Sequence, residues 1–323
     1  MKKHKKIISI VVALAIIIGN ISITVDAAAK FKQYSPVGSI KKSNAYKKYQ
    51  SFFSRVNFTS EKNFIVPGLN TNMTPQGMCD IGDYILISAY DHSKKSNSCI
   101  HVIKKSNGKI AKTLYIKGNK THVGGLAYDG KYVWVANSTN STLGRISASD
   151  IKNKKDNSTI SATNFSVTNE KGQKITASFA TYSNKTLWVG VFTEKSNSYA
   201  YGYTIGSSKL TLKYKVQIPD RIQGMVFDSK GNLILSQSYG RNNPSKILTY
   251  DKLSYKTVGK RYEAKLGKVK YSLTAPPTSQ NMFIGKDNLL YILFESAAKC
   301  YYEGTSNKAK EPVDRVCAIK IAN

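Results

Sequence analysis

QGMCDIGDYILISAY, residues 76–90, decides the fold, because the chain contains four further variants of it. Each copy has a short apolar run, then a turn rich in Gly, Asp, Asn or Lys, then a second apolar or β-branched run. That pattern predicts two antiparallel strands joined by a tight turn. The other copies are GGLAYDGKYVWVANS (124–138), TASFATYSNKTLWVGVF (176–192), QGMVFDSKGNLILSQSY (223–239) and SQNMFIGKDNLLYILFES (279–296).

The spacing of these copies predicts how the hairpins are arranged. Corresponding strand positions recur about every 46 to 58 residues, at Ser88, Ala136, Gly190, Ser236 and Phe294. This is the period of a four-stranded sheet repeated around an axis. We therefore predict an all-β protein, a five-bladed β-propeller. A six-bladed ring, in which the N-terminal segment contributes more than one strand, is the alternative.

Strand counting indicates how the ring closes. Outer strands of the second, third and fourth blades are predicted near 163–167, 213–218 and 261–266. The fifth copy has only three strands, near 281–284, 289–294 and 315–321. Residues 64–66, which precede the first repeat, can supply the missing outer strand. We predict that this N-terminal strand closes the last blade and leaves no long open edge.

The N-terminal 29 residues have the features of a secretory signal peptide. A lysine-rich start precedes an apolar run at 7–18 and the small-residue stretch 27–29. The run is shorter than the roughly 20 residues that a membrane-spanning helix needs. An uncleaved anchor is the alternative. The rest divides into a basic N-terminal strap, 30–62, and the propeller domain, 63–323. We expect a secreted protein, extracellular or associated with the cell wall, with no transmembrane segment after cleavage.

The strap contains an apolar pattern of its own. Tyr46, Tyr49, Phe53 and Val56 recur at spacings of three and four, which predicts one face of a short helix. Such a basic helix either lies on a membrane surface or packs on the outside of the domain. We favour packing on the domain.

The charge balance is strongly basic. Lys and Arg number 49 against 19 Asp and Glu, a formal net charge of +30 that is spread over nearly every turn. One interpretation is adhesion to an anionic cell-wall polymer or another anionic surface. The other is a biased composition in which lysines solvate loops. The chain has no specific nucleic-acid motif, and we expect a monomer.

The four cysteines allow a disulfide in an exported chain. Cys300 and Cys317 bracket a polar loop and could form a bridge. Cys79 and Cys99 are predicted on the first and third strands of one blade, too far apart for a disulfide. Cys79 is therefore predicted as a small core residue.

The candidate site follows from propeller geometry. The start of each innermost strand and the end of its neighbour lie on the same face near the axis, where loops 91–98 and 297–314 also open. Polar residues gathered there form the default ligand site. The strand starts carry Gln76, His122, Thr176, Gln223 and Gln280, and the strand ends carry Tyr90, Asn137, Gln237, Tyr239, Glu295 and Ser296.

Two of these residues point most directly to function. Glu295 follows the apolar run LLYILF, so its carboxylate is expected at an inner strand end where burial is costly unless it is paired or ligated. His122 precedes two glycines that permit close backbone approach, and it is the only histidine placed at the axis. His92 and His101 are predicted as loop and strand-surface residues.

Enzymatic signatures are sparse. The chain lacks the H-E-x-x-H, G-x-S-x-G, P-loop and dinucleotide-binding motifs. A metal site built from His122, Glu295, Asn137 and Gln237 would offer one imidazole and one carboxylate among amides, a weak ligand set. The sequence therefore names no cofactor.

The blade motifs QGMCD, HVGGLAYDGKYVWVANS and QGMVFDSKGNLILS resemble those of exported bacterial propellers grouped with streptogramin lyases and NHL-repeat proteins. The resemblance covers roughly 67–321 and lies in the blade pattern, which many functions share. It implies a propeller whose axial face in the lyases holds a metal between histidines and a glutamate. Only His122 and Glu295 match such residues, and a second catalytic histidine is missing.

Together these features predict an exported cell-envelope or extracellular propeller that binds a polar or anionic ligand at its axial face. The alternative is a metal-dependent lyase or hydrolase acting at the same axial pocket. The two differ in whether the axial residues hold a metal ion.

Overall fold

A computed structural model of the chain describes residues 33–303 and 305–321. These residues lie in one compact unit, which includes the strap from residue 33 onward. The predicted signal peptide lies outside the described residues. Among the residues that the structure describes, no helix is long and apolar enough to cross a membrane.

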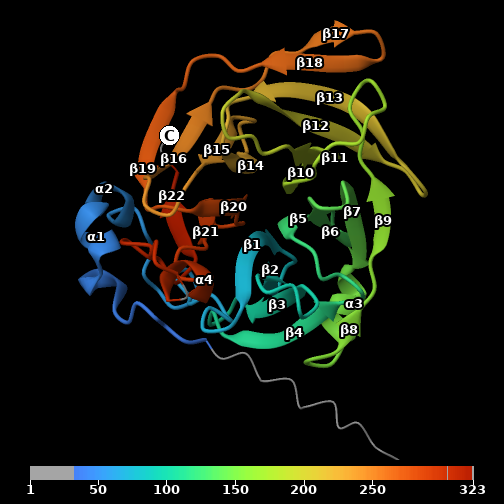
Figure 1. The fold of residues 1–323 in the computed structure, drawn as a ribbon. Helices are drawn as coiled ribbons and strands as arrows, with labels where there is room; N and C mark the ends of the chain where they lie inside the picture. Colours follow the sequence, from blue (N-terminus) through green and yellow to red (C-terminus); the bar gives the residue numbers. More distant parts are fainter. Residues whose placement is uncertain (1–32, 304, 322–323) are drawn as a thin grey trace, which may run out of the picture. The chain divides into compact units, whose positions relative to one another are not determined.

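Five sheets stand around a common axis, each with its first strand innermost (Figure 1). The prediction of five blades is therefore confirmed, and the six-bladed alternative is wrong. In the order of hydrogen bonding, blade 1 contains β1 (Met73–Asp80), β2 (Tyr84–Asp91), β3 (Cys99–Lys104), β4 (Ile110–Ile116) and β8 (Thr159–Ile160); blade 2 contains β5 (Val123–Tyr128), β6 (Tyr132–Asn137), β7 (Thr142–Ser147) and β9 (Thr163–Ser166).

The remaining blades differ in strand number. Blade 3 contains β10 (Phe179–Ser183), β11 (Thr186–Gly190), β12 (Ser198–Ile205), β13 (Leu210–Ile218), β18 (Arg261–Lys265) and β17 (Lys256–Val258); blade 4 contains β14 (Ile222–Phe227), β15 (Leu233–Gln237), β16 (Ser245–Tyr250) and β19 (Tyr271–Ala275); blade 5 contains β20 (Ser279–Ile284), β21 (Leu289–Phe294) and β22 (Cys317–Lys320). Short helices α3 (Ala148–Asn153) and α4 (Lys299–Tyr302) lie in connections.

The prediction that 261–266 forms the outer strand of the fourth blade is wrong. It forms β18, which pairs in parallel with β13 of the third blade. Tyr262 stacks on Tyr214 there, with ring centroids 5.4 Å apart, and Ala264 is buried. The outer strand of the fourth blade is β19, whose Leu273 and Ala275 face the core. The Tyr262–Tyr214 contact thus accompanies the pairing of β18 with the third blade. The alternating buried residues of β19 accompany its pairing with the fourth.

The N-terminal segment closes the fifth blade where it was predicted. Val316 N donates a hydrogen bond to Phe64 O (3.0 Å), and Val66 N donates to Asp314 O (2.9 Å). The segment is not a continuous strand, because a turn at 59–63 separates two isolated bridges, Ile65 to Arg315 and Val56 to Ile319. The outer edge of β22 is thus covered by hydrogen-bonded chain.

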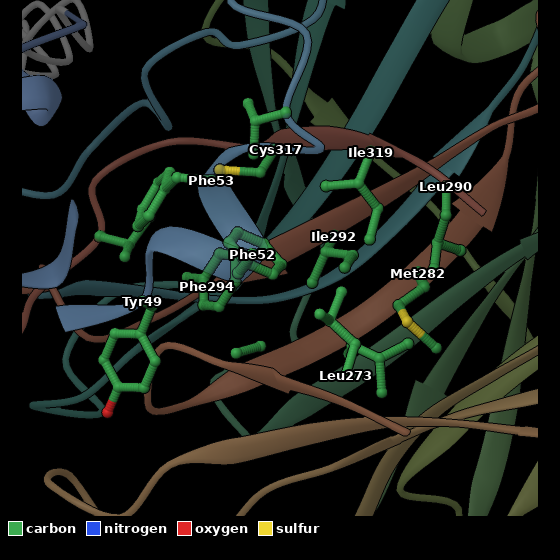
Figure 2. Packing of buried hydrophobic residues seen from close by; sticks show 14 of the residues in the cluster. Tyr49, Phe52, Phe53, Leu273, Met282, Leu290, Ile292, Phe294, Cys317 and Ile319 are labelled. Atoms are coloured by element: carbon green, nitrogen blue, oxygen red, sulfur yellow. The ribbon is translucent and has the colours of Figure 1, made fainter. Parts of the chain in front are cut away.

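The strap forms η1 (Ile40–Lys42), α1 (Asn44–Lys48) and α2 (Gln50–Phe53). Its apolar face is buried against the fifth blade: Phe52 and Phe53 are 0% and 1% exposed, and Phe52 contacts the ring of Phe294 at 5.8 Å (Figure 2). The same side chains cannot also enter a bilayer. The prediction that the strap packs on the domain is therefore confirmed, and the membrane-surface interpretation is wrong.

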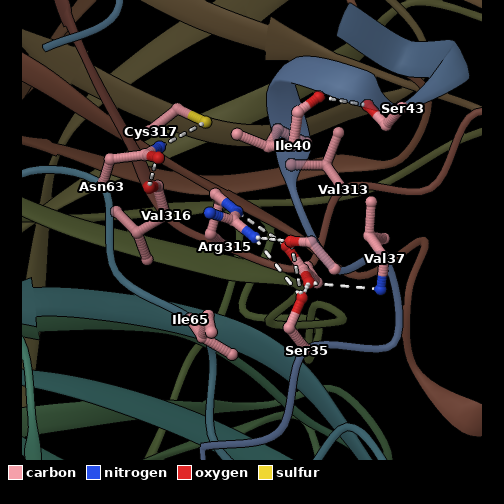
Figure 3. A network of polar contacts seen from close by, with 12 residues as sticks. Ser35, Val37, Ile40, Ser43, Asn63, Ile65, Val313, Arg315, Val316 and Cys317 are labelled. Carbon is pink, nitrogen blue, oxygen red and sulfur yellow. Dashed lines mark hydrogen bonds and ion pairs between the residues drawn. The ribbon is translucent and has the colours of Figure 1, made fainter. Parts of the chain in front are cut away.

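A polar cluster fastens the start of the strap to the fifth blade. Asp314 is fully buried and accepts hydrogen bonds from Arg315 Nε (2.7 Å) and from the Ser35 hydroxyl, and Arg315 Nη2 donates to Gly38 O (3.0 Å) (Figure 3). A buried carboxylate is stable when it is paired and hydrogen-bonded in this way.

Two smaller predictions are wrong. The Cys300–Cys317 bridge is absent, because all four cysteines are free. Cys317 is buried in the fifth-blade core, whereas the Cys300 thiol contacts Thr74 Oγ1 at 3.3 Å. His101 is not a surface residue but is fully buried, with Nδ1 2.9 Å from Thr113 Oγ1. Cys79 is a core residue and His92 lies in an exposed loop, as predicted.

Candidate functional site

Three glutamines reach the axis through β-bulges at the starts of the inner strands. In blade 1, Pro75 pairs with Ala89 and Gly77 with Ser88, so Gln76 is left outside the ladder. The same interruption leaves Gln223 unpaired in blade 4, and Gln280 with Asn281 in blade 5. A bulge re-aims the extra side chain. The recurring sequences QGM and QNM therefore deliver amide groups to one place.

These amides line a cavity of about 350 Å³ at the axial mouth. Its lining comes from all five blades and contains no lysine or arginine. It is formed by Gln76, His122, Ser138, Thr176, Ser178, Phe192, Gln223, Gln280, Glu295 and Tyr301. A concave pocket that is lined mainly by polar residues and contains two aromatic rings is suited to a small hydrogen-bonding ligand.

Glu295 is the carboxylate of this cavity. It is 8% exposed, and each of its oxygens accepts an amide hydrogen bond, Oε1 from Gln280 Nε2 at 2.8 Å and Oε2 from Gln76 Nε2. It forms no ion pair within the described residues. Burial raises the pKa of Glu295 to about 8, although the two amides favour the charged form.

Local structure holds Glu295 at this position. Its N–H donates to Thr278 O (3.3 Å), and its own carbonyl accepts from Ala298 N (2.9 Å) just before α4. The α4 helix then carries Tyr301 back over the cavity, where its side chain hydrogen-bonds Glu295. The negative charge of Glu295 and burial both raise the pKa of Tyr301.

His122 is the imidazole of the lining. Its Nδ1 is 3.1 Å from Ser138 Oγ, and its ring centroid is 4.4 Å from that of Tyr90. Burial lowers the pKa of His122 to about 4, so the imidazole is neutral at neutral pH. It can donate or accept a hydrogen bond but brings no positive charge to the cavity.

Arg241 is the cationic group that acts on Glu295 from outside the lining. Its guanidinium lies over the ring of Tyr301, 4.8 Å from the centroid, and donates to Thr305 Oγ1 and Asn307 O, both at 2.8 Å. These contacts hold the 305–307 loop to blade 4, and Arg241 makes no ion pair with Glu295.

The structure brings together Gln76, His122, Thr176, Gln223, Gln280 and Glu295 from the predicted set. Tyr90 lies behind His122 rather than in the lining, and burial raises its pKa to about 12. The other strand-end residues are engaged elsewhere: Asn137 with Thr121, Gln237 with Asp220, Ser296 with the N–H of Val313, and Tyr239 with Glu194.

Inner strands of different blades contact one another at the axis. Asn281 Oδ1 accepts from Met78 N (3.0 Å) and its Nδ2 donates to Ala180 O (3.3 Å), which joins blades 5, 1 and 3. At Gly124 a Cβ atom would lie 2.0 Å from Ser178 O, so only glycine allows this approach of blades 2 and 3. These contacts hold the inner strands in place around the axis.

Sequence reasoning missed five residues of this region: Ser138, Ser178, Phe192, Tyr301 and Asn281. Ser138, Ser178 and Phe192 lie within the quoted repeats at strand ends, and an alignment of these ends would have indicated them. Tyr301 lies in a loop that was predicted to open on this face. Asn281 occupies the position that is glycine in the QGM copies. Nothing in the sequence pattern indicated that its side chain bonds across the axis.

A metal ion has few ligands at this mouth. Within 33–303 and 305–321, no group of three or more His, Cys, Asp or Glu side chains is placed to hold one. Around the cavity only His122 and Glu295 are strong ligand types, and both are engaged with protein partners. The donor set does not fit a catalytic metal, which usually has three protein ligands.

Comparison with known proteins yields distant structural similarities only. No protein-family model matches the chain. No curated protein matches it. The glutaminyl cyclase of Myxococcus xanthus is 11% identical, with a TM-score of 0.46 over 77% of this chain and 90% of that one. The PQQ-bound aldose sugar dehydrogenase of Streptomyces coelicolor is 11% identical, with a TM-score of 0.48 over 82% and 97%. Similarities this distant carry no argument about function, and the resemblance to streptogramin lyases stays a prediction.

Proposed function

We propose that this chain is an exported binding protein of the cell envelope or extracellular space that holds a polar ligand with a protonated amine in its axial cavity. Glu295 is the counter-charge for that amine. The observation that carries the proposal is a carboxylate, 8% exposed, that lines a cavity and has only neutral hydrogen-bond partners, the amides of Gln76 and Gln280 and the side chain of Tyr301.

Desolvation supports a cationic group on the ligand. Burying a carboxylate without a counter-charge is costly, and neutral hydrogen-bond donors compensate only in part. A ligand ammonium placed beside Glu295 would supply the missing charge, while Gln76 and Gln280 keep the carboxylate oriented. The remaining hydroxyls, Gln223 and neutral His122 would contact the polar parts of the ligand, and the Phe192 and Tyr301 rings its apolar face.

An anionic ligand suits this cavity less well. Its lining has no lysine or arginine, and the ring nitrogens of His122 belong to a neutral imidazole at neutral pH. An anion beside Glu295 would further disfavour the ionised form of its carboxyl group, so the two would gain no electrostatic attraction. The anionic partner expected from the net charge therefore belongs to another surface. The metal-dependent lyase or hydrolase is not favoured, because the lining lacks its ligands.

Matched ligand pairs test the proposal. Glucosamine is compared with glucose, and putrescine with 1,4-butanediol, by thermal shift and calorimetry at pH 8.5. We expect the amine member of at least one pair to bind and its hydroxyl analogue to bind at least tenfold more weakly. Glu295→Gln should abolish that preference. Glu311→Gln is the control, because Glu311 is a buried carboxylate paired with Lys48 outside the cavity.

The contradicting outcomes are distinct. Equal affinity for the amine and hydroxyl members of both pairs would overturn the amine assignment. Amine binding that persists in Glu295→Gln would move the site away from the axial mouth.

A further inference from the structure

A second cavity, of about 140 Å³, lies between blades 3 and 4. Its lining includes Ser183 at the hairpin turn between β10 and β11, and Gly231 in the turn between β14 and β15. The axial cavity is reached at the other ends of these hairpins, by Ser178 and Gln223. No described residue lines both cavities, so the second one is a separate place for a ligand.

Four aromatic rings in contact with one another line this second cavity. The ring of Trp188 lies 5.3 Å from that of Phe227 and 5.5 Å from that of Tyr214, between centroids. Tyr214 in turn contacts Tyr255 at 5.2 Å. Trp188 and Tyr214 are paired to Gly202 from either side, and this glycine leaves room for their rings to meet. Aromatic faces suit a ligand ring, and a cavity of about 150 Å³ is large enough for one benzene molecule.

The indole N–H of Trp188 has no acceptor in the described part of the chain, although Trp188 is 4% exposed. A buried tryptophan usually donates this N–H to a partner, because an unsatisfied buried donor is costly. The Nε1 atom itself is not sealed from solvent. Because Trp188 lines the second cavity, a group bound there can accept the hydrogen bond.

The second blade contains the same arrangement with its acceptor in place. Its hairpin YDGKYVWV, from residue 128, aligns residue for residue with YSNKTLWV, from residue 182. Trp134 matches Trp188, and its Nε1 donates to Asp129 Oδ2 at 2.7 Å. Each tryptophan packs against the next blade of the ring. Ser183 occupies the position of Asp129, so blade 3 lacks the carboxylate that satisfies the indole in blade 2, and the serine that replaces it lines the cavity.

The charge of the lining favours an anionic ligand. Lys252 is its one charged residue, and Lys252 forms no ion pair within 33–303 and 305–321. The acids next to lining residues in the sequence are engaged elsewhere. Asp251 pairs with Lys270 at 2.7 Å, and Asp228 Oδ1 and Oδ2 accept from the backbone and side-chain N–H groups of Asn232, both at 2.8 Å. An anion in the cavity therefore meets a cation and no acid of the lining.

We propose that the second cavity binds a small carboxylate attached to a six-membered ring. The carboxylate takes the place that Asp129 fills in blade 2 and accepts the hydrogen bond of Trp188 Nε1, with Lys252 as its counter-charge. The ring lies against the aromatic side chains of the lining. Ser183 and Asn184, whose side chains have no hydrogen-bond partner among the described residues, can contact ligand hydroxyl groups. Aromatic acids and uronic acids share this chemistry.

Indole NMR signals test this proposal directly. The chain contains two tryptophans, so its ¹H–¹⁵N spectrum has two indole signals, and Trp188→Phe identifies the signal of Trp188. Benzoate is compared with benzyl alcohol, and glucuronate with glucose. We expect the acid of at least one pair to shift the Trp188 signal and to bind at least tenfold more tightly than its neutral partner. The Trp134 signal should not move, because Asp129 already accepts its N–H. The responding pair distinguishes an aromatic acid from a uronic acid.

Ser183→Asp separates a ligand site from a water-filled gap. It restores the hairpin pattern of blade 2, so its carboxylate should accept the Trp188 N–H and weaken binding of the acid at least tenfold. Ser106→Asp adds the same charge to an exposed turn of blade 1 and should leave binding unchanged. Lys252→Gln should weaken binding at least fivefold, whereas Glu295→Gln, in the axial cavity, should have no effect.

Three results would overturn the proposal. One is a Trp188 signal that no acid shifts, which would mean that the cavity holds water only. The second is equal affinity for the acid and neutral members of both pairs. The third is acid binding that persists in both Ser183→Asp and Lys252→Gln. An unchanged Trp134 signal and an unchanged melting temperature establish that the variants are folded.

Discussion

Glu295 couples the stability of the protein to pH. Its pKa lies near the ordinary value of 4.5 in the unfolded chain and is raised to about 8 in the folded one. Between these values the folded state keeps the proton and the unfolded state has released it. Raising the pH through this window therefore favours unfolding. This stability is present below pH 4.5 and is lost as the pH rises to 8.

Glu295→Gln should remove this dependence. We expect the variant to be similar in stability to the parent near pH 5 and more stable near pH 9, because the variant carries no buried charge there. Urea unfolding of both proteins at pH 5, 7 and 9 measures the difference. A stability difference that stays constant across this range would show that Glu295 does not titrate with a raised pKa.

The single residues of the mouth were predictable in part. Glu295 was predicted because a carboxylate directly after an apolar strand is costly to bury. His122 was predicted because it precedes glycines that allow close approach of the backbone. Asn137 and Gln237 satisfied the same positional rule but bond to Thr121 and Asp220. Whether these side chains point into the cavity depends on their hydrogen-bond partners in neighbouring loops. The spacing of the repeats does not specify those partners.

At the scale of elements, the β-bulge is the device that forms the site. The first two strands of each blade were predictable from apolar runs and turn residues. The bulges were not, because QGM and VGGL are compatible with a regular strand. Contact across the axis decides the bulge: Ser88 Oγ donates to Gly124 O at 2.8 Å, and a Cβ at Gly77 would lie 2.4 Å from that same oxygen.

Gly124→Ala tests how tightly the inner strands approach. The new Cβ would meet the backbone oxygen of Ser178 at 2.0 Å, which no rotamer change can relieve. We expect a loss of about 1 to 3 kcal/mol in the free energy of unfolding, as in other overpacked cores. Gly267→Ala is the matched control, because nothing lies within 4 Å of its Cβ position. Equal stability of the two variants in urea unfolding would contradict the packing described for the axis.

Across the whole molecule, periodicity predicted the ring and its closure. Five similar hairpins required five blades, and the missing strand of the last blade required an N-terminal partner. The assignment of β18 failed because its apolar pattern suits the outside of either neighbouring blade. Only the stacking of Tyr262 on Tyr214 places it on the third. Sequence spacing counts strands but does not choose between two adjacent edges.

The positive charge of the molecule is unevenly distributed over its surfaces. The +30 net charge of the chain contributes no lysine or arginine to the axial lining, whereas residues 252–270, which include β17 and β18, contain seven cationic residues and one acid. The basic composition and the axial pocket therefore belong to different surfaces.

The axial cavity is lined by residues from all five blades, so the titration of its carboxyl group reports on the ring and the site together. We would measure the pKa of Glu295 by ¹³C NMR of the side-chain carboxyl carbon, assigned with Glu295→Gln. We predict a midpoint near pH 8 in the free protein, and a lower midpoint when glucosamine or putrescine occupies the cavity. A midpoint near the ordinary 4.5 that neither amine shifts would contradict it.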